Sequence, residues 1–113
     1  MSKILITGVN GFVGQAVSKR LRQDGLHVLA GTTRQPNSDA GPERVPLYHI
    51  PEIGPETDWT QAVSGAEIVI HLAARVHIMK ERSSDPFAAF RRVNSEGTKA
   101  LAIQAAAAGV KRF

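Results

Sequence analysis

The sequence predicts an α/β fold with a doubly wound parallel sheet, and three observations support that prediction. Short apolar runs bounded by glycine or by polar turns recur along the chain, as strands buried on both faces of a parallel sheet require. Segments with apolar residues at helical spacing lie between these runs. Because strands and helices alternate, right-handed crossovers and the strand order 3-2-1-4-5 are expected.

The first strand and the first helix are predicted near the start of the chain. Residues 3–7, KILIT, form a largely apolar run that ends at a glycine-rich segment. From Gly11 to about Asp24, apolar residues recur at near-helical spacing, and Gly25 stands where helices commonly end. A strand that turns directly into a helix is therefore expected here.

Two more strands and a short helix are predicted next. Residues 26–33, LHVLAGTT, form the second strand, and residues 34–44 are expected to be a loop because they contain turn formers without periodicity. Residues 45–50, VPLYHI, form a weaker third strand. Pro46 places it near an edge of the sheet, since proline cannot donate a ladder hydrogen bond. A short helix follows at about 58–63.

The last part of the chain contains the clearest strand and the longest helix. Residues 67–74, EIVIHLAA, form the fourth strand. After a polar loop, a long helix is predicted over 85–109, because Asp85 suits an N-cap and Pro86 suits the first turn. Residues 110–113 then begin a fifth strand, so the chain looks cut within that strand.

The composition is that of a folded protein of about one domain. The chain has 113 residues, of which 42% are hydrophobic and 21% charged. Cysteine is absent, which excludes disulfides, a thiolate nucleophile and cysteine metal sites. The first apolar run is too short for a membrane span and unlike a cleavable signal, so a cytoplasmic location without membrane association is expected. Basic residues are scattered despite the net charge of +4, which argues against nucleic-acid binding.

The segment TGVNGFVG, residues 7–14, places Gly8, Gly11 and Gly14 between the first strand and the first helix. A pyrophosphate binds well at such a turn, because unpaired N–H groups and the helix dipole favour negative charge there. Gly8 would let the chain turn, Gly11 would let phosphate approach the backbone, and Gly14 would let the helix pack close to the strands. The alternative is a glycine-rich turn that only connects two elements. Its place in the first unit of a parallel sheet favours a Rossmann-type dinucleotide-binding domain.

Four stretches carry a resemblance to a known family. They are TGVNGFVG at 7–14, VIHLAA at 69–74, VNSEGT at 93–98 and AAAAGVKRF at 105–113. In this order they resemble the extended short-chain dehydrogenase/reductase family, in particular its NAD-dependent nucleotide-sugar epimerases and dehydratases. The region from 71 to 98 is most similar to UDP-sugar 4-epimerases and 4-ketoreductases. The resemblance implies that residues 1–113 form an NAD(P)-binding domain whose catalytic and substrate-binding part is absent.

The resemblance also implies which residues contact the pyrophosphate and the adenine ring of the cofactor. Glu52 and Ile53 fall where the family has an acid and an apolar residue beside the adenine, although the acid is usually Asp. The residues expected to line the pyrophosphate are Gly8, Gly11, Phe12, Val13 and Gly14.

At the adenosine ribose the chain departs from the NAD pattern. The family often has an acid at the end of the second strand, where this chain has Thr32, followed by Thr33 and Arg34. Hydroxyl groups and an arginine suit a ribose 2′-phosphate, and the missing carboxylate would otherwise repel it. Thr33 and Arg34 are therefore expected to contact the cofactor, with a modest preference for NADP over NAD. The alternative for Arg34 is an exposed loop residue.

At the other end of the cofactor, the resemblance places Leu72, Ala73 and Ala74 near the nicotinamide ribose. Alanines at the end of a strand are commonplace, so only the resemblance makes them informative. Asn94 would help to order the active-site end, and Gly97 would let the long helix lie against the sheet. Without the resemblance, an exposed Asn94, or one hydrogen-bonded to the backbone, is the expected alternative.

Several other polar or aromatic residues are given structural roles. His49, His71 and His77 have no metal-ligand spacing, and no metal site is expected. Asp58 is expected at a helix start, and Trp59 is expected to pack in the interior.

No catalytic residue is assigned within the chain. The resemblance implies hydride transfer between nicotinamide and a sugar carbon, with a Tyr-x-x-x-Lys pair and a Ser or Thr as the reacting groups. The family's Tyr and Lys would follow Phe113, and the single tyrosine, Tyr48, stands in the third predicted strand. The fragment is therefore expected to be inactive, whereas its parent would be an oxidoreductase or isomerase acting as a homodimer on a nucleotide sugar, in particular a UDP-linked one.

Two other functions fit parts of the pattern. A non-catalytic NADP-binding regulator of the same fold would keep the glycine turn and lack the Tyr and Lys. A methyltransferase-type sheet that binds S-adenosylmethionine is disfavoured, because that ligand has no pyrophosphate for the three glycines to accommodate.

Overall fold

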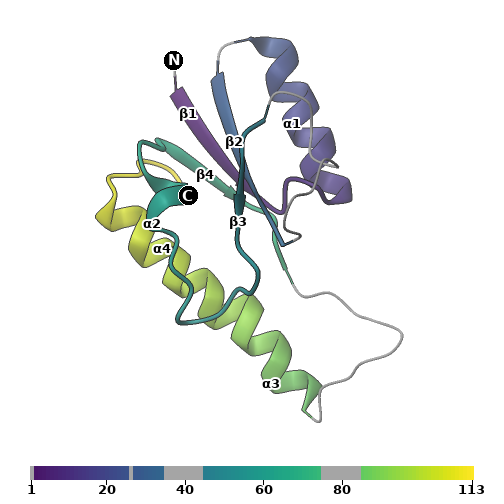
Figure 1. Ribbon diagram of the computed structural model, residues 1–113, viewed down its shortest axis with the longest axis vertical. Helices are drawn as coiled ribbons and strands as arrows, with labels where there is room; N and C mark the ends of the chain where they lie inside the picture. Colours follow the sequence, from purple (N-terminus) through teal and green to yellow (C-terminus); the bar gives the residue numbers. More distant parts are fainter. Residues whose placement is uncertain (1, 26, 35–44, 75–84) are drawn as a thin grey trace.

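The chain forms a parallel four-stranded sheet, which a computed structural model describes for residues 2–25, 27–34, 45–74 and 85–113. The order β3-β2-β1-β4 confirms the predicted arrangement of the first four strands and puts β3 at an edge (Figure 1). Every pairing between neighbouring strands is parallel. The strands are β1 (Ser2–Thr7), β2 (His27–Thr33), β3 (Leu47–His49) and β4 (Ile68–His71).

Alternate residues of β1 pack on opposite faces of the sheet, so each face has its own apolar cluster. Ile4 and Ile6 belong to one cluster and Leu5 to the other. Helix α1 (Phe12–Asp24) covers the first face. The second face is covered by α2 (Thr60–Val63) and α4 (Gly97–Ala107), as Figure 1 shows. Helices on both faces make this a doubly wound α/β fold.

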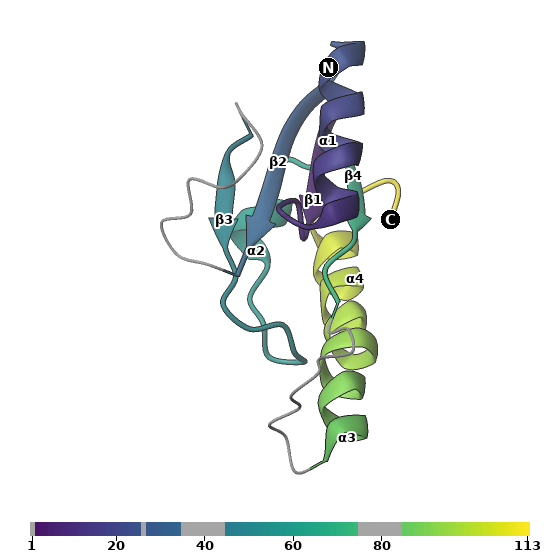
Figure 2. The same ribbon diagram turned by 90° about the vertical axis from the view of Figure 1, so that its right-hand side faces the viewer.

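The predicted long helix is present, but its middle is not α-helical. It consists of α3 (Pro86–Arg91), a π-helical turn η1 (Arg92–Glu96) and α4. The predicted cap is confirmed, because the Asp85 carboxylate accepts the Ala88 N–H at 3.1 Å. Figure 2 shows that the α3 end of this helix extends beyond the sheet. Apolar spacing cannot reveal one widened turn, since the residues on either side keep helical spacing.

The third and fourth strands are shorter than predicted. β4 ends at His71, because its partner β1 ends at Thr7 and turns away at Gly8, leaving Leu72 to Ala74 without a strand to pair with. β3 covers only Leu47–His49 of the predicted 45–50. Its flanks still bond to β2, through Gly31 N–H to Pro46 O at 2.8 Å and Ile50 N–H to Thr33 O at 2.9 Å.

The helix after the third strand is confirmed in a shortened form as α2, one turn that begins at Thr60. Asp58 lies just before it, and its carboxylate accepts both the backbone N–H of Thr60, at 2.9 Å, and the Thr60 hydroxyl. These bonds hold the pKa of Asp58 below its usual range. Trp59 is fully buried in the cluster that α4 covers, as expected for a packing residue.

Two predicted segments lie outside the described residues, and a third is only begun. The loop at 34–44, apart from Arg34, and the loop at 75–84, which includes His77, belong to the segments that are not described. Near the end of the chain Arg112 forms a single parallel bridge with Ile68, and Val69 N–H donates to Arg112 O at 2.9 Å. This contact with β4 is where a fifth strand would begin. In the described parts of the chain, no helix has the length and apolar character needed to cross a membrane.

Candidate functional site

The glycine turn between β1 and α1 is shaped by backbone contacts that leave no room for side chains. Gly8 has φ +66°, and a Cβ atom there would lie 2.9 Å from the Ala73 nitrogen. A Cβ atom on Gly14 would overlap the Gly8 carbonyl oxygen and the Val9 backbone. Both glycines are therefore required by the packing of the turn against its own helix and against the end of β4.

Gly11 is the N-cap of α1, and its position differs from that of the other two glycines. Its φ of −72° is open to any residue, and a Cβ atom there would meet only the Gly8 oxygen, at 3.2 Å. None of the described side chains caps this helix, and its first turn carries no acidic residue. The first N–H groups of the helix therefore have no capping side chain among the described residues, and a helix end of this kind can bind an anion.

Phe12 and Val13 form the first turn of α1 and are exposed. Phe12 is 96% exposed and Val13 56%, although both are large apolar residues. The five residues expected at the pyrophosphate thus lie in one turn at the carboxyl end of β1, where Gly11, Phe12 and Val13 are exposed and Gly14 is buried. This is the end of a parallel sheet where ligands bind.

Two hydroxyl groups at the end of β2 contact the glycine turn. The Thr32 hydroxyl lies 3.4 Å from the Gly8 nitrogen, and Thr33 Oγ1 accepts from Asn10 Nδ2 at 3.0 Å. Thr33 is buried, and its hydroxyl faces the glycine turn, whereas Arg34 is exposed. Sequence reasoning placed Thr32 only at the adenosine ribose and missed Asn10, because nothing in their spacing shows that the turn folds back over β2.

The segment after β4 lies against the glycine turn. Thr7 Oγ1 accepts the N–H groups of Leu72, at 3.0 Å, and Ala73, at 3.1 Å. Leu72 N–H also lies 3.3 Å from Thr7 O. The fully buried hydroxyl of Thr7 therefore holds two residues expected at the nicotinamide ribose beside Gly8. Thr7 was missed as a site residue, although a hydroxyl residue directly before the glycine turn is a recognisable signal.

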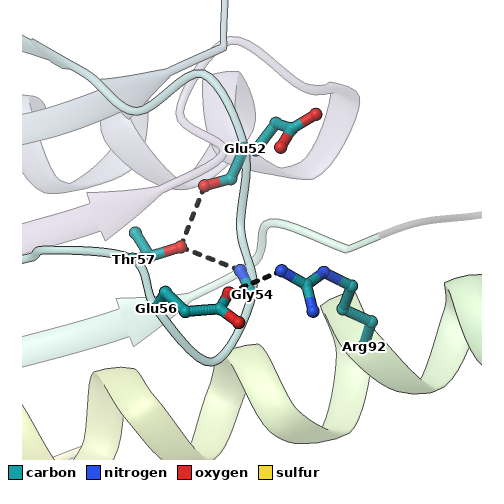
Figure 3. Close-up of polar contacts among 5 residues, drawn as sticks. All are labelled: Glu52, Gly54, Glu56, Thr57 and Arg92. Carbon is teal, nitrogen blue, oxygen red and sulfur yellow. Dashed lines mark hydrogen bonds and ion pairs between the residues drawn. The ribbon is translucent and has the colours of Figure 1, made fainter.

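Glu52 and Ile53 lie on the loop between β3 and α2, which is fastened by its own side chains (Figure 3). Thr57 Oγ1 donates to Glu52 O at 2.9 Å and accepts the Gly54 N–H at 2.8 Å. Arg92 of η1 pairs with Glu56 at 2.5 Å. Figure 3 shows the Glu52 carboxylate pointing away from that pair. The backbone of Glu52 is thus held while its side chain stays exposed.

The long helix contacts this loop rather than the sheet at Gly97, which corrects the sequence-based expectation. A Cβ atom on Gly97 would lie 2.5 Å from Ile53 Cγ2 and 3.4 Å from the Gly54 nitrogen. The close approach therefore serves the loop after β3. Such a contact cannot be foreseen, because the sequence does not indicate how that loop folds back.

Asn94 lies in the π-helical turn and is exposed. Its carbonyl oxygen accepts the Thr98 hydroxyl at 2.8 Å, which confirms that the two residues share a face of the helix. Thr98 Oγ1 in turn lies 3.0 Å from His71 Nε2. The described contacts do not bring Asn94 directly against the glycine turn, but they connect it to β4 through these two side chains.

A shallow groove of about 530 Å³ lies at the end of β3. It is lined by His49, Ile50, Pro51, Glu52, Thr57 and Asp58, and so includes one of the residues expected beside the adenine ring. No group of three or more possible metal ligands occurs in the part of the chain that the structure describes.

Comparison with protein families gives one match over nearly the whole chain. Residues 4–113 match the NAD dependent epimerase/dehydratase family. The UDP-glucose 4-epimerase of Vibrio cholerae is 36% identical over 111 residues, which are 97% of this chain and 33% of that protein.

Solved structures show the same similarity. A short-chain dehydrogenase/reductase superfamily protein from Agrobacterium tumefaciens, solved with bound NAD, is 30% identical with a TM-score of 0.69, covering 96% of this chain and 30% of that one. MoeE5, solved with UDP-glucuronic acid and NAD, is 26% identical with a TM-score of 0.72, covering 96% of this chain and 34% of that one. The chain therefore spans about a third of the length of the relatives it matches.

Proposed function

This chain belongs to the NAD-dependent epimerase/dehydratase family, and we propose that it forms the cofactor-binding part of an enzyme that acts on a nucleotide sugar. The bound nicotinamide would supply hydride transfer at a sugar carbon. The observation that carries the proposal is the bare N-terminus of α1, where an uncapped helix of 13 residues with no acid in its first turn stands beside Gly8. This site fits a diphosphate, since both the free N–H groups and the dipole favour an anion.

The surrounding residues have distinct tasks in this proposal. Gly8, Gly11, Phe12, Val13 and Gly14 bind the pyrophosphate, and Thr33 and Arg34 face the adenosine ribose. Glu52 and Ile53 lie beside the adenine ring. Leu72, Ala73 and Ala74 border the nicotinamide ribose, where small side chains leave room, and Asn94 orders the active-site end.

The proposal places proton transfer outside this chain. Its single tyrosine, Tyr48, lies on β3, separated from β4 by two strands, and it packs in the apolar cluster that α4 covers. The Lys3 ammonium lies 5.8 Å from the centre of the Tyr48 ring. A tyrosine in this position cannot reach a substrate at the end of β4. The acid/base residues and the UDP-sugar contacts are therefore assigned to the remainder of the protein. The whole protein is proposed to be a cytoplasmic homodimer.

Gly11 offers a direct test in the full-length protein that carries this chain. Aspartate is a preferred N-cap residue, so Gly11→Asp should keep α1 folded. Its carboxylate would stand against the pyrophosphate, where like charges about 4 Å apart cost about 4 kcal/mol at an effective dielectric constant near 20. We expect NAD(P) affinity to fall by at least roughly 30-fold after salt screening.

Gly11→Asn is the matched control, because it caps equally well without a charge. Titration of both variants with NAD and NADP, followed by cofactor fluorescence or calorimetry, gives the comparison. Equal affinities for the aspartate variant and the asparagine variant would contradict a pyrophosphate at this helix. Saturable binding of S-adenosylmethionine in place of NAD(P) would favour the methyltransferase-type alternative.

The choice between NAD and NADP depends on Arg34 in this proposal. The two solved relatives described above carry NAD, so the modest preference for NADP rests only on Thr32, Thr33 and Arg34. Arg34→Ala should lower NADP affinity by roughly tenfold, as expected for one lost charge-assisted contact, and leave NAD affinity unchanged. If both affinities fall equally, or neither falls, Arg34 does not contact a 2′-phosphate.

A further inference from the structure

The imidazole of His71 lies between two hydroxyl groups from different elements. Its Nδ1 is 2.7 Å from Thr7 Oγ1, at the end of β1, and its Nε2 is 3.0 Å from Thr98 Oγ1, on α4. The ring is also packed by Trp59 and Phe113, with centroid distances of 6.4 Å and 6.2 Å. His71 therefore joins the end of the sheet to the long helix.

The hydroxyl at each end determines which ring nitrogen carries the proton. Thr7 Oγ1 already accepts two backbone N–H groups, from Leu72 and Ala73, which occupy both of its lone pairs. It can bond to His71 only by donating its own proton, so Nδ1 must be the acceptor. The Thr98 hydroxyl donates its proton to the Asn94 carbonyl oxygen, so it can only accept a hydrogen bond from His71 Nε2. The Thr98 end requires a proton on Nε2, and the Thr7 end requires an unprotonated Nδ1. Together the two ends select the neutral imidazole with its proton on Nε2.

The surroundings of the ring favour the same neutral form. Burial lowers the pKa of His71 below its ordinary value of 6.5. The four side chains that bond or pack against the ring, those of Thr7, Trp59, Thr98 and Phe113, carry no charge that could stabilise an imidazolium. A second proton at Nδ1 would also point an N–H at a hydroxyl without a free lone pair.

From these contacts we infer that His71 is a positioning residue whose fixed Nε2–H tautomer holds the segment after β4 and the π-helical turn in their relative places. Through Thr7 it orients the hydroxyl that holds Leu72 and Ala73 against the glycine turn. Through Thr98 it reaches the carbonyl of Asn94. The structural part of this inference stands alone, whereas its meaning for cofactor affinity rests on the proposed function.

The tautomer is tested first in the unmodified full-length protein, by ¹⁵N NMR of its histidine side chains. The expected signature for His71 is an unprotonated Nδ1 and a protonated Nε2, which remain the predominant form at pH 6.5 because the pKa of this imidazole lies below that value. A protonated Nδ1, or exchange between the two tautomers, would overturn the inference. This measurement needs neither a variant nor a cofactor.

Two substitutions then separate the two bonds, because an Asn side chain places its amide near Nδ1 and a Gln side chain places its amide near Nε2. His71→Asn keeps an acceptor for Thr7, whereas His71→Gln keeps only the donor to Thr98. We expect the Ala73 amide to exchange with solvent about tenfold faster in the glutamine variant, and within about threefold of wild type in the asparagine variant. His49→Asn and His49→Gln are the matched controls on an exposed histidine.

Cofactor titration of the same variants gives the functional readout. NAD(P) affinity should fall about tenfold in His71→Gln and change less than about threefold in His71→Asn. Equal losses in the two variants, or exchange rates like those of the His49 controls, would overturn a positioning role. If the wild-type protein binds neither nucleotide, the proposed function fails, while the NMR and exchange measurements still decide the inference.

Discussion

The glycine turn after β1 and the loop after β3 are held in place by opposite means. The glycine turn depends on missing side chains, since Cβ atoms on Gly8 or Gly14 would meet backbone atoms at impossible distances. The loop after β3 depends on side chains that are present. The Thr57 hydroxyl bonds to the backbone of Glu52 and Gly54, and Glu56 pairs with Arg92. Backbone packing tolerates no substitution, whereas exposed polar contacts are weak individually.

This contrast predicts the largest effect for Gly14→Ala. Its Cβ would overlap the Gly8 oxygen and the Val9 backbone, neither of which can move without reshaping the turn. We expect a loss of about 3 kcal/mol or more in the free energy of unfolding, at the upper end of overpacking effects. Denaturant unfolding of the full-length protein measures it.

Gly54→Ala is the matched control in the loop after β3. A Cβ atom there would meet only the flexible guanidinium of Arg92, at 3.3 Å, so a cost below about 1 kcal/mol is expected. Equal costs for the two substitutions would contradict the distinction between the regions.

The second effect concerns Thr7, which joins the glycine turn to the segment after β4. Thr7→Val keeps the shape of the side chain but removes the acceptor of the Ala73 N–H and the donor to His71. A loss of about 2–3 kcal/mol in the free energy of unfolding is expected from the unpaired buried groups. Thr7→Ser keeps the hydroxyl and should cost about 1 kcal/mol for the lost methyl group. A serine variant as unstable as the valine variant would argue against the hydrogen bonds.

The third effect is a pH dependence that comes from His71. The pKa of His71 is about 6.5 in the unfolded chain and lower in the folded chain. At pH values between the folded-state and unfolded-state pKa, the unfolded chain therefore binds more protons than the folded chain. Its contribution to stability is complete above pH 6.5, declines as the pH falls, and levels off below the folded-state pKa. The difference in unfolding free energy between wild type and His71→Asn, measured from about pH 8 to about pH 5, isolates this contribution. A constant difference would contradict it.

The smallest effect is expected in the loop after β3. Glu56→Gln removes one charge of the Glu56–Arg92 pair, whose side chains are 71% and 52% exposed. Exposed pairs of this kind contribute between about 0 and 1 kcal/mol and are screened by salt. We expect a loss of at most about 0.5 kcal/mol that disappears at high ionic strength. A loss as large as that of Thr7→Val would show that this loop, like the glycine turn, does not tolerate the loss of a single contact.

The sequence predicted most accurately those features that depend on neighbouring residues in the chain. The order of the first four strands, the helix from Gly11 to Asp24, the caps at Gly25 and Asp85, and the glycine turn were all predicted and confirmed. The limits of β4 and the contact of Gly97 were not, because the first depends on where β1 ends and the second on the path of a distant loop. All the cofactor contacts remain predictions, those of the glycine turn as well as those of Arg34, Glu52 and Asn94.

The sequence by itself determined the alternation of strands and helices, the place of the glycine turn and the family. These follow from local patterns, since apolar period and glycine spacing act over a few residues. Only the tertiary structure decided that Thr7, His71 and Thr98 form one polar chain with a single allowed tautomer. These residues are far apart in the sequence and individually ordinary. Their roles arise because folding brings a hydroxyl with no free lone pair against one ring nitrogen of a partly buried imidazole.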